Sequence, residues 1–439
     1  MATIAQAPVI AVPRTATATT RDTGIDFVRA LCILGVVLLH SLMVGVTLTP
    51  NGPVFDNAST GTWWIVPVSW TLQVMPLFFI IGGFSGLTAY RRQRGRGEPA
   101  SVFVAGRVHR LLRPAVVAVA LAGIALLSLA AAGVSPELIA VAGFRYGQPL
   151  WFLAVFLLCQ ALLPALAAAH ERAPRLTLAL LAGAALSVDG VRIATGAEAV
   201  GFLNLAFVWL TLKQLGFFFA DGSIDALGRK VRAVTGVGAI ALLVATTAAG
   251  VYSPDLIASI NPPTGALLLV GMAHLSALSL FRDRLRAISR APLAASFSRF
   301  VNGRAMTIYL WHMPVLLAMA GVSALAALTA GVHLSTPSSL GWWIGRPLWL
   351  GAALAFAALT ALLFTRAETA PAPAAATAPG RLLGAVLLGV ASVGLLLVVG
   401  TSPITAAVSV GGLLCALALA RDPGSDRRRI RIAPPALRR

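Results

Sequence analysis

The chain has 439 residues, of which 58% are hydrophobic and only 11% are charged. Its mean hydropathy is +0.86, and this composition excludes a soluble globular domain, which needs a larger charged surface. The formal net charge of +19 would suit a nucleic-acid partner, so the placement of the basic residues decides what the charge means.

Apolar stretches that are long enough to cross a bilayer recur along the whole sequence. A helix needs roughly 17–25 apolar residues to cross a hydrocarbon core of about 30 Å. We therefore predict an all-α, polytopic transmembrane helical bundle of about twelve spans. The predicted spans are 27–48, 63–89, 114–133, 149–169, 176–190, 200–220, 233–250, 264–281, 305–330, 343–365, 383–400 and 403–420.

The basic residues are distributed very unevenly between the two sides of this bundle. With a cytoplasmic N-terminus, 30 of them fall in the inner segments, whereas the outer loops hold only Arg145, Arg192 and Arg346. This is the distribution that the positive-inside rule describes. The positive charge therefore indicates topology and attraction to anionic membrane lipids, and not a nucleic-acid partner.

Composition also divides the chain into segments. Residues 1–24 lack the features of a cleavable signal and are predicted to form a disordered cytoplasmic tail. Residues 25–366 hold the first ten spans. A Pro/Ala-rich linker at 367–382 separates them from two additional transmembrane helices within 383–420, and 421–439 is a basic tail that we also expect to be disordered.

The first span carries two basic side chains eleven positions apart, Arg29 and His40. Eleven residues turn a helix through about 1100°, so the two side chains share one face and lie about 16 Å apart along the axis. With the N-terminus inside, Arg29 lies at the cytosolic boundary and His40 slightly beyond the midplane. The pattern predicts one wall of a cavity that opens to the cytosol and ends at an imidazole.

Each of these residues also has a purely structural interpretation. Arg29 could be an interfacial anchor paired with Asp26 at i,i+3, and His40 could be a hydrogen-bonding residue between packed helices. For His40 we favour a functional role, because ionisable groups at membrane depth are expensive and usually face a cavity. An imidazole, with a reference pKa of about 6.5, can remove a proton from an alcohol near neutral pH.

Four stretches in chain order resemble the acyltransferase-3 family of integral-membrane O-acyltransferases, which modify sugars, lipids and antibiotics. They are the R-x10-H pattern of the first span, "MPLFFIIGGFSG" (75–86), "PLWFLAVFLLCQALLP" (149–164) and "MTIYLWHMPVLL" (306–317). The likeness covers roughly residues 25–366, so the last two spans are additional. One departure is Gly82, which stands where the family has a serine in its FFxxSGF segment.

The resemblance implies an acyl-CoA donor, and several residues are candidates to bind the two substrates. Arg107, Arg110 and Arg113 follow one another at i, i+3 and i+6, and could hold the phosphates of coenzyme A or act as topology anchors. The resemblance adds two donor-binding candidates, Tyr309 and His312. Candidates to bind the acceptor are Arg145 and Trp151.

The sequence as a whole predicts a multi-pass protein of the cytoplasmic membrane that transfers an acyl group, most simply acetyl, from acyl-CoA. The acceptor is expected to be a hydroxyl of a carbohydrate or lipid-linked molecule, with His40 as general base and Arg29 positioning it. We expect no metal site. Two alternatives stay open. One is a multi-span transporter of a small solute, against which it counts that the carboxylates lie in loops or at span ends; the other is an inactive membrane scaffold of the same fold.

Overall fold

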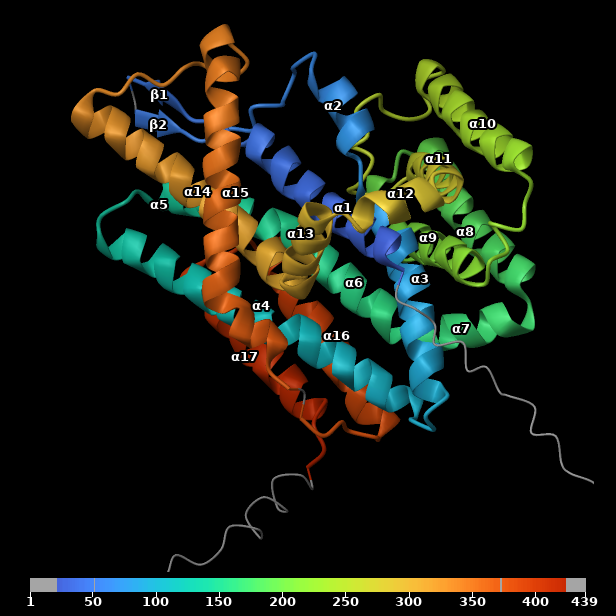
Figure 1. Cartoon of the computed structure of the whole chain (residues 1–439). Helices are drawn as coiled ribbons and strands as arrows, with labels where there is room; N and C mark the ends of the chain where they lie inside the picture. Colours follow the sequence, from blue (N-terminus) through green and yellow to red (C-terminus); the bar gives the residue numbers. More distant parts are fainter. Residues whose placement is uncertain (1–21, 51, 372, 424–439) are drawn as a thin grey trace, which may run out of the picture.

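The computed structural model of the protein describes residues 22–50, 52–371 and 373–423, and its fold is almost entirely helical (Figure 1). In these ranges the two strands form one short antiparallel hairpin, β1 (Thr47–Thr49) with β2 (Gly52–Val54). The all-α prediction is confirmed. The α-helices are α1 (Thr23–Met43), α2 (Ile65–Leu72), α3 (Met75–Arg94), α4 (Ala100–Ala131), α5 (Pro136–Gly147), α6 (Trp151–Ala161), α7 (Leu163–Arg172), α8 (Pro174–Thr195), α9 (Asn204–Ala220), α10 (Arg229–Ala248), α11 (Ala266–Leu280), α12 (Arg282–Ser289), α13 (Pro292–Gly303), α14 (Ala305–Ala330), α15 (Leu340–Thr369), α16 (Pro379–Val398) and α17 (Pro403–Leu419), and the 3-10 helices are η1 (Gln148–Leu150) and η2 (Glu198–Leu203).

The helices have the length and composition of membrane spans. Within the described residues, ten helical stretches are long and apolar enough to cross a bilayer, and α11 with α12 would make eleven if this pair, bent by 68°, is one span. The twelfth predicted span corresponds to α17, which is apolar but has only 17 residues. The prediction of a polytopic helical bundle is therefore confirmed, with a span count that depends on these two short elements.

The first helix ends earlier than the predicted span. α1 stops at Met43 instead of residue 48, because the chain turns into the β1–β2 hairpin. Gly52 has a φ of 112°, a backbone conformation that only glycine adopts readily. As a result His40 lies in the last turn of α1 and not near its middle.

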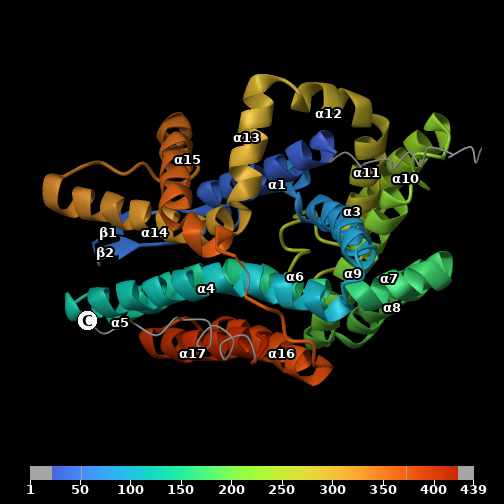
Figure 2. The same ribbon diagram turned by 60° about the horizontal axis from the view of Figure 1, so that its bottom comes forward.

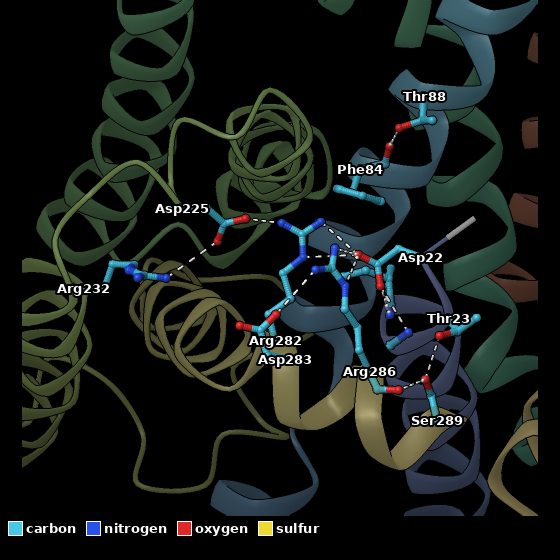
Figure 3. A network of polar contacts seen from close by, with 12 residues as sticks. Asp22, Thr23, Phe84, Thr88, Asp225, Arg232, Arg282, Asp283, Arg286 and Ser289 are labelled. Carbon is cyan, nitrogen blue, oxygen red and sulfur yellow. Dashed lines mark hydrogen bonds and ion pairs between the residues drawn. The ribbon is translucent and has the colours of Figure 1, made fainter. Parts of the chain in front are cut away.

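The N-terminal end of α1 is fixed by a group of ion pairs that we call the Asp22 clamp: Asp22, Asp225, Arg282 and Arg286 (Figure 3). Asp22 caps α1 through its side chain, which accepts hydrogen bonds from the backbone of Gly24 and Ile25. Its other carboxylate oxygen accepts from Arg282 at 2.9 Å and from Arg286 at 2.7 Å. The clamp joins the start of α1 to α12.

Burial of the Asp22 carboxylate would by itself raise its pKa. The hydrogen bonds and charges of Arg286 and Arg282 outweigh this effect, so the pKa of Asp22 lies below its usual value. The carboxylate therefore stays charged within the clamp.

The two C-terminal helices form a layer of their own against the rest of the bundle. α16 and α17 pack on α4, and α16 also packs on α6, on the side of α4 opposite α1 (Figure 2). α15 continues to Thr369 and α16 begins at Pro379, so the connection between them is shorter than the predicted linker; residue 372 lies outside the described residues. The predicted tails at 1–24 and 421–439 fall almost wholly outside them as well.

Candidate active site

His40 has one ring nitrogen fixed and the other available. Its Nδ1 lies 2.9 Å from the carbonyl oxygen of Val36, one turn earlier in α1. Because a carbonyl can only accept, Nδ1 carries the hydrogen, and in the neutral ring Nε2 holds a free electron pair. This tautomer is the one that a general base at Nε2 requires.

A second imidazole lies against the first. The ring centroids of His40 and His312 are 4.9 Å apart, and the rings meet edge to face at 61°. The Nδ1 of His312 donates to the carbonyl oxygen of Tyr309, which leaves its Nε2 as an acceptor. This Nε2 is buried and has no hydrogen-bond partner among the described residues. The two histidines are separated by more than 270 positions in the sequence, and the packing of α14 on α1 brings them together.

α14 is held in register by contacts at its first turns. Glu368, near the end of α15, accepts hydrogen bonds from the backbone N–H groups of Met306 and Thr307 and from the Thr307 hydroxyl. These N–H groups have no partner within the helix, and a carboxylate there also opposes the helix dipole. Tyr309 donates its hydroxyl to the carbonyl oxygen of Pro149 at 2.6 Å. Both contacts position His312.

His40 lines a small cavity at its end of α1. The cavity has a volume of about 40 Å³, enough for a few water molecules. Its polar lining comes from His40, Asp56, Arg145 and Gln148, and the rest is mostly apolar, from the end of α1 and from α14. The guanidinium of Arg145 is 3.5 Å from the side-chain oxygen of Gln148. His40 and Arg145, predicted separately as base and acceptor ligand, thus lie on one cavity.

Arg29 is engaged elsewhere. Its Nε donates to the side-chain oxygen of Asn302 in α13 at 2.7 Å, and a terminal nitrogen donates to Asp26 at 2.8 Å. Asn302 in turn donates to the backbone oxygen of Asp26 and to Ser298. Arg29 is not among the residues that line the His40 cavity. The cavity lies at the end of α1 next to the β1–β2 hairpin, and not at the end predicted to be cytosolic. The arginine ties α1 to α13.

The three predicted donor-binding arginines lie on one helix, α4, and differ in their surroundings. Arg107 stacks over the ring of Phe103 at 4.7 Å. Arg110 is exposed. Arg113 donates to the backbone oxygens of Ala370 and Pro371, so it holds the connection that follows α15.

Trp151, the second predicted acceptor ligand, lies in an aromatic stack. Its ring is 5.6 Å from that of Trp209 and 6.2 Å from that of Phe152, between α6 and α9. It is not among the residues that line the His40 cavity.

The glycines of "IIGGFSG" differ in what surrounds them. A Cβ at Gly83 would collide with the backbone oxygen of Lys213, so glycine is required for α3 and α9 to pack this closely. A Cβ at Gly82 would meet only a carbon of Phe156, at an ordinary 3.5 Å. The position where the family has serine therefore has room for one.

Sequence reasoning missed a group of polar side chains at the end of α3 and α9, with a buried histidine at its centre. His170 is 3% exposed and bonds through Nε2 to Asp221 at 2.8 Å, while Gln214 bonds to its Nδ1. Arg91 bridges Asp221 and Glu171. The hydrogen bond from Arg94 is the largest cause of the lowered pKa of Glu171. No motif marks this group, since its members lie on three helices.

Some of the contacts at the site were also missed, above all Asn302 and Glu368. An amide and a carboxylate at the ends of predicted helices look like ordinary boundary residues in the sequence. In the described part of the chain, no group of three or more His, Cys, Asp or Glu side chains could hold a metal ion.

The bundle of apolar helices is that of a multi-pass membrane protein, and His40, one of two neighbouring imidazoles, lines a small cavity within it. The chain belongs to the acyltransferase-3 family, since the model of that family, described as an acyltransferase domain, matches residues 22–366. The match ends before α16 and α17. No curated protein and no solved structure matches the chain.

Proposed function

We propose that the protein is an O-acyltransferase of the cytoplasmic membrane that moves an acyl group, most simply acetyl, from acyl-CoA to a hydroxyl of a carbohydrate or lipid-linked acceptor. Membership of the family supports acyl transfer. The observation that carries the proposal is the fixed tautomer of His40, whose Nε2 is free to accept a proton beside a cavity that also holds Arg145.

His40 acts as the general base. Its Nε2 takes the proton of the acceptor hydroxyl as the acceptor oxygen forms a bond to the acyl carbon. The C–S bond of the thioester then breaks, and the leaving thiolate of coenzyme A takes the proton from His40. A base positioned in this way contributes about 10²–10⁴-fold to the rate.

His312 stabilises the protonated base. Once His40 has taken the proton, both of its nitrogens are donors, and the buried Nε2 of His312 is an acceptor without a partner among the described residues. With ring centroids 4.9 Å apart, a hydrogen bond between the two rings needs only a small reorientation. Arg29 contributes by fixing α1, and so the base, through Asp26 and Asn302.

The two substrates approach from opposite ends of α1. Arg107, Arg110 and Arg113 lie on the predicted cytosolic side, where guanidinium groups suit the phosphates of coenzyme A. One terminal nitrogen of Arg113 is already bonded to the carbonyls of Ala370 and Pro371, so its other nitrogens would make this contact. The acceptor enters through the His40 cavity, where Arg145 and Gln148 offer hydrogen bonds to its hydroxyls. At about 40 Å³ the cavity has room for no more than a few water molecules, so acceptor binding must widen it.

The test is acyl transfer by the purified full-length protein in lipid nanodiscs. Radiolabelled acetyl-CoA is mixed with fractionated cell-envelope glycans and lipids, and release of free coenzyme A is followed with and without acceptor. The wild type should release it only with an acceptor, and His40→Ala should lower the rate at least about 10²-fold.

Ser41→Ala is the matched control, because the Ser41 hydroxyl only bonds Val37 within α1 and the residue does not line the cavity. Full turnover by His40→Ala would remove the assigned base. Solute uptake into proteoliposomes without consumption of acetyl-CoA would replace the proposal with transport.

A further inference from the structure

Two short helices near the start of α1, α12 and α13, run along the bundle and do not cross it. α12 is bent by 68° from α11, and the two helices have only 8 and 12 residues, too few to cross a bilayer. Both pack on α1, and Figure 2 shows them as an arch over its first turns. We call residues 281–303 the α12–α13 arch. It lies at the end of α1 that is predicted to be cytosolic.

One face of each helix of the arch is occupied by contacts with the N-terminal part of α1. On α12 this face carries Arg282 and Arg286, which pair with Asp22. On α13 it carries Asn302, which bonds Arg29. These contacts hold the arch against α1 and determine which of its side chains point away from the protein.

The outward side of the arch exposes large apolar side chains. Phe281 and Ile288 are 47% and 51% exposed, and Leu293, at the start of α13, is 86% exposed. Contact with water is unfavourable for such side chains. In a multi-pass membrane protein, the acyl chains of lipids can cover them where a helix lies along the membrane surface.

Basic side chains stand among these apolar ones. Arg284, Arg290 and Arg299 are exposed, and they form no ion pair with any of the described residues. The arch contains one carboxylate, Asp283, which already pairs with Arg286. The outward side of the arch is therefore positively charged.

A basic face interleaved with exposed apolar side chains is typical of helices that lie in the headgroup region of a membrane. A partner protein would have to supply acidic and apolar groups together, whereas anionic phospholipids carry both and already surround a membrane-spanning bundle. Each basic side chain at a membrane surface strengthens the attraction to anionic lipids. We propose that the α12–α13 arch is a binding surface for anionic phospholipids of the inner leaflet. This lipid binding goes beyond the proposed acyl transfer and does not depend on it.

The experiment measures which lipids lie next to the arch of the full-length protein in nanodiscs. A bimane fluorophore is attached to Leu293→Cys in a protein that also carries Cys415→Ser, because the other two cysteines, Cys32 and Cys159, are buried. The nanodiscs consist of phosphatidylcholine with a small fraction of phosphatidylglycerol or phosphatidylcholine that carries a quenching nitroxide near the headgroup. Phosphatidylglycerol should be enriched at the fluorophore at least about fivefold over phosphatidylcholine, the effect of a single arginine at a membrane surface.

Arg290→Gln combined with Arg299→Gln should remove this enrichment. The matched control is Arg172→Gln combined with Arg175→Gln, which lowers the net charge by the same amount. These two arginines are also exposed, but they belong to α7 and α8, away from the arch (Figure 2). The control should keep the enrichment, because the attraction depends on the arginines of the arch and not on the charge of the whole chain.

A fluorophore on Val398→Cys, in the same Cys415→Ser protein, is the control for the position of the probe. Val398 ends α16 on the predicted outer side and is 87% exposed, so phosphatidylglycerol should not be enriched there. Lipid binding by the arch is excluded if no lipid quenches the fluorophore at position 293, if both lipids quench it alike, or if the two double variants behave alike. None of these measurements uses acetyl-CoA, so a failure of acyl transfer cannot be mistaken for a failure of lipid binding.

Discussion

The two ends of α1 use their polar side chains in opposite ways. At the Thr23 end Asp22 and Arg29 bond residues of other helices, through the Asp22 clamp and Asn302, and Asp26 bonds Arg29. At the Met43 end His40 uses one nitrogen within its own helix and lines a cavity. One end immobilises the helix, and the other presents the imidazole that we propose as the base.

This difference shows that a shared helical face does not imply a shared role. Arg29 and His40 lie on one stripe of α1, about 16 Å apart. Their neighbours decide what they do: Arg29 meets a carboxylate and an amide, whereas His40 meets a second imidazole and a small cavity. Immobilising one end gives the other end a fixed geometry, which a positioned base needs.

The comparison predicts that Arg29→Gln mainly destabilises the protein. Hydrogen bonds to charged groups contribute about 1.5–3 kcal/mol, so thermal unfolding in nanodiscs should shift by a comparable free energy. Acyl transfer per folded molecule should fall far less than in His40→Ala, because Arg29 acts on the base only through the position of α1. Asn302→Ala is the companion variant, and it should show the same pattern. An unchanged stability together with a raised KM for acetyl-CoA would instead make Arg29 a ligand of the donor.

At the other end the comparison predicts the reverse for His312. His312→Phe removes the acceptor that faces His40 and should lower kcat about tenfold, the effect of one hydrogen bond of about 1.4 kcal/mol. His312→Gln, which keeps an acceptor, should recover part of the rate. The pH profile of kcat separates the roles: the acidic limb, where His40 is protonated, should move in His312→Phe. An unmoved limb would make His312 a packing residue.

The fold could be predicted from the sequence, because the length and apolarity of each span and the arginines of each loop are visible without knowledge of the tertiary contacts. The site was accessible only in part. The motifs single out His40 and His312, but their contact depends on how α14 packs on α1, which no spacing reveals. The depth of His40 was misjudged because the apolar run continues past Met43 into β1.

Hydrogen bonds between residues far apart in the sequence could not be predicted either. Arg29 was assigned to a cavity because Asn302 is not recognisable as its partner in the sequence. Arg113, favoured as a phosphate ligand, donates to the carbonyls after α15. In both cases an arginine on an apolar helix found its acceptors on another element, and only the tertiary structure identifies them.

A smaller effect is expected for Arg145, which shares the cavity with His40. Arg145→Gln should raise the KM for the acceptor about fivefold and leave kcat nearly unchanged, since one hydrogen bond to a bound hydroxyl contributes about 1 kcal/mol. Arg346→Gln is the control: this arginine is also predicted to be on the outer side, but it lies over Trp342 at 4.1 Å. Equal KM values for the two variants would place the acceptor elsewhere.

The smallest effect concerns acid and the fixed end of α1. The folded pKa of Asp22 lies below its unfolded value, because Arg286 and Arg282 more than offset burial. The stability that Asp22 contributes is therefore fully present above the pKa of an unfolded aspartate, about 4, and is lost as the pH falls through the lower pKa of the folded state.

Melting curves between neutral pH and pH 3 should consequently fall less steeply for Asp22→Asn than for the wild type. Asp283→Asn should follow the wild type. The Asp283 carboxylate is 98% exposed and makes a longer ion pair with Arg286, at 3.5 Å, and such a solvated pair contributes little to stability. Because the clamp lies at the end of α1 away from His40, Asp22→Asn should also keep its acyl transfer at neutral pH. If activity and acid stability were lost together, the two ends of the helix would not be separable, and the reactive end would depend on the clamp directly.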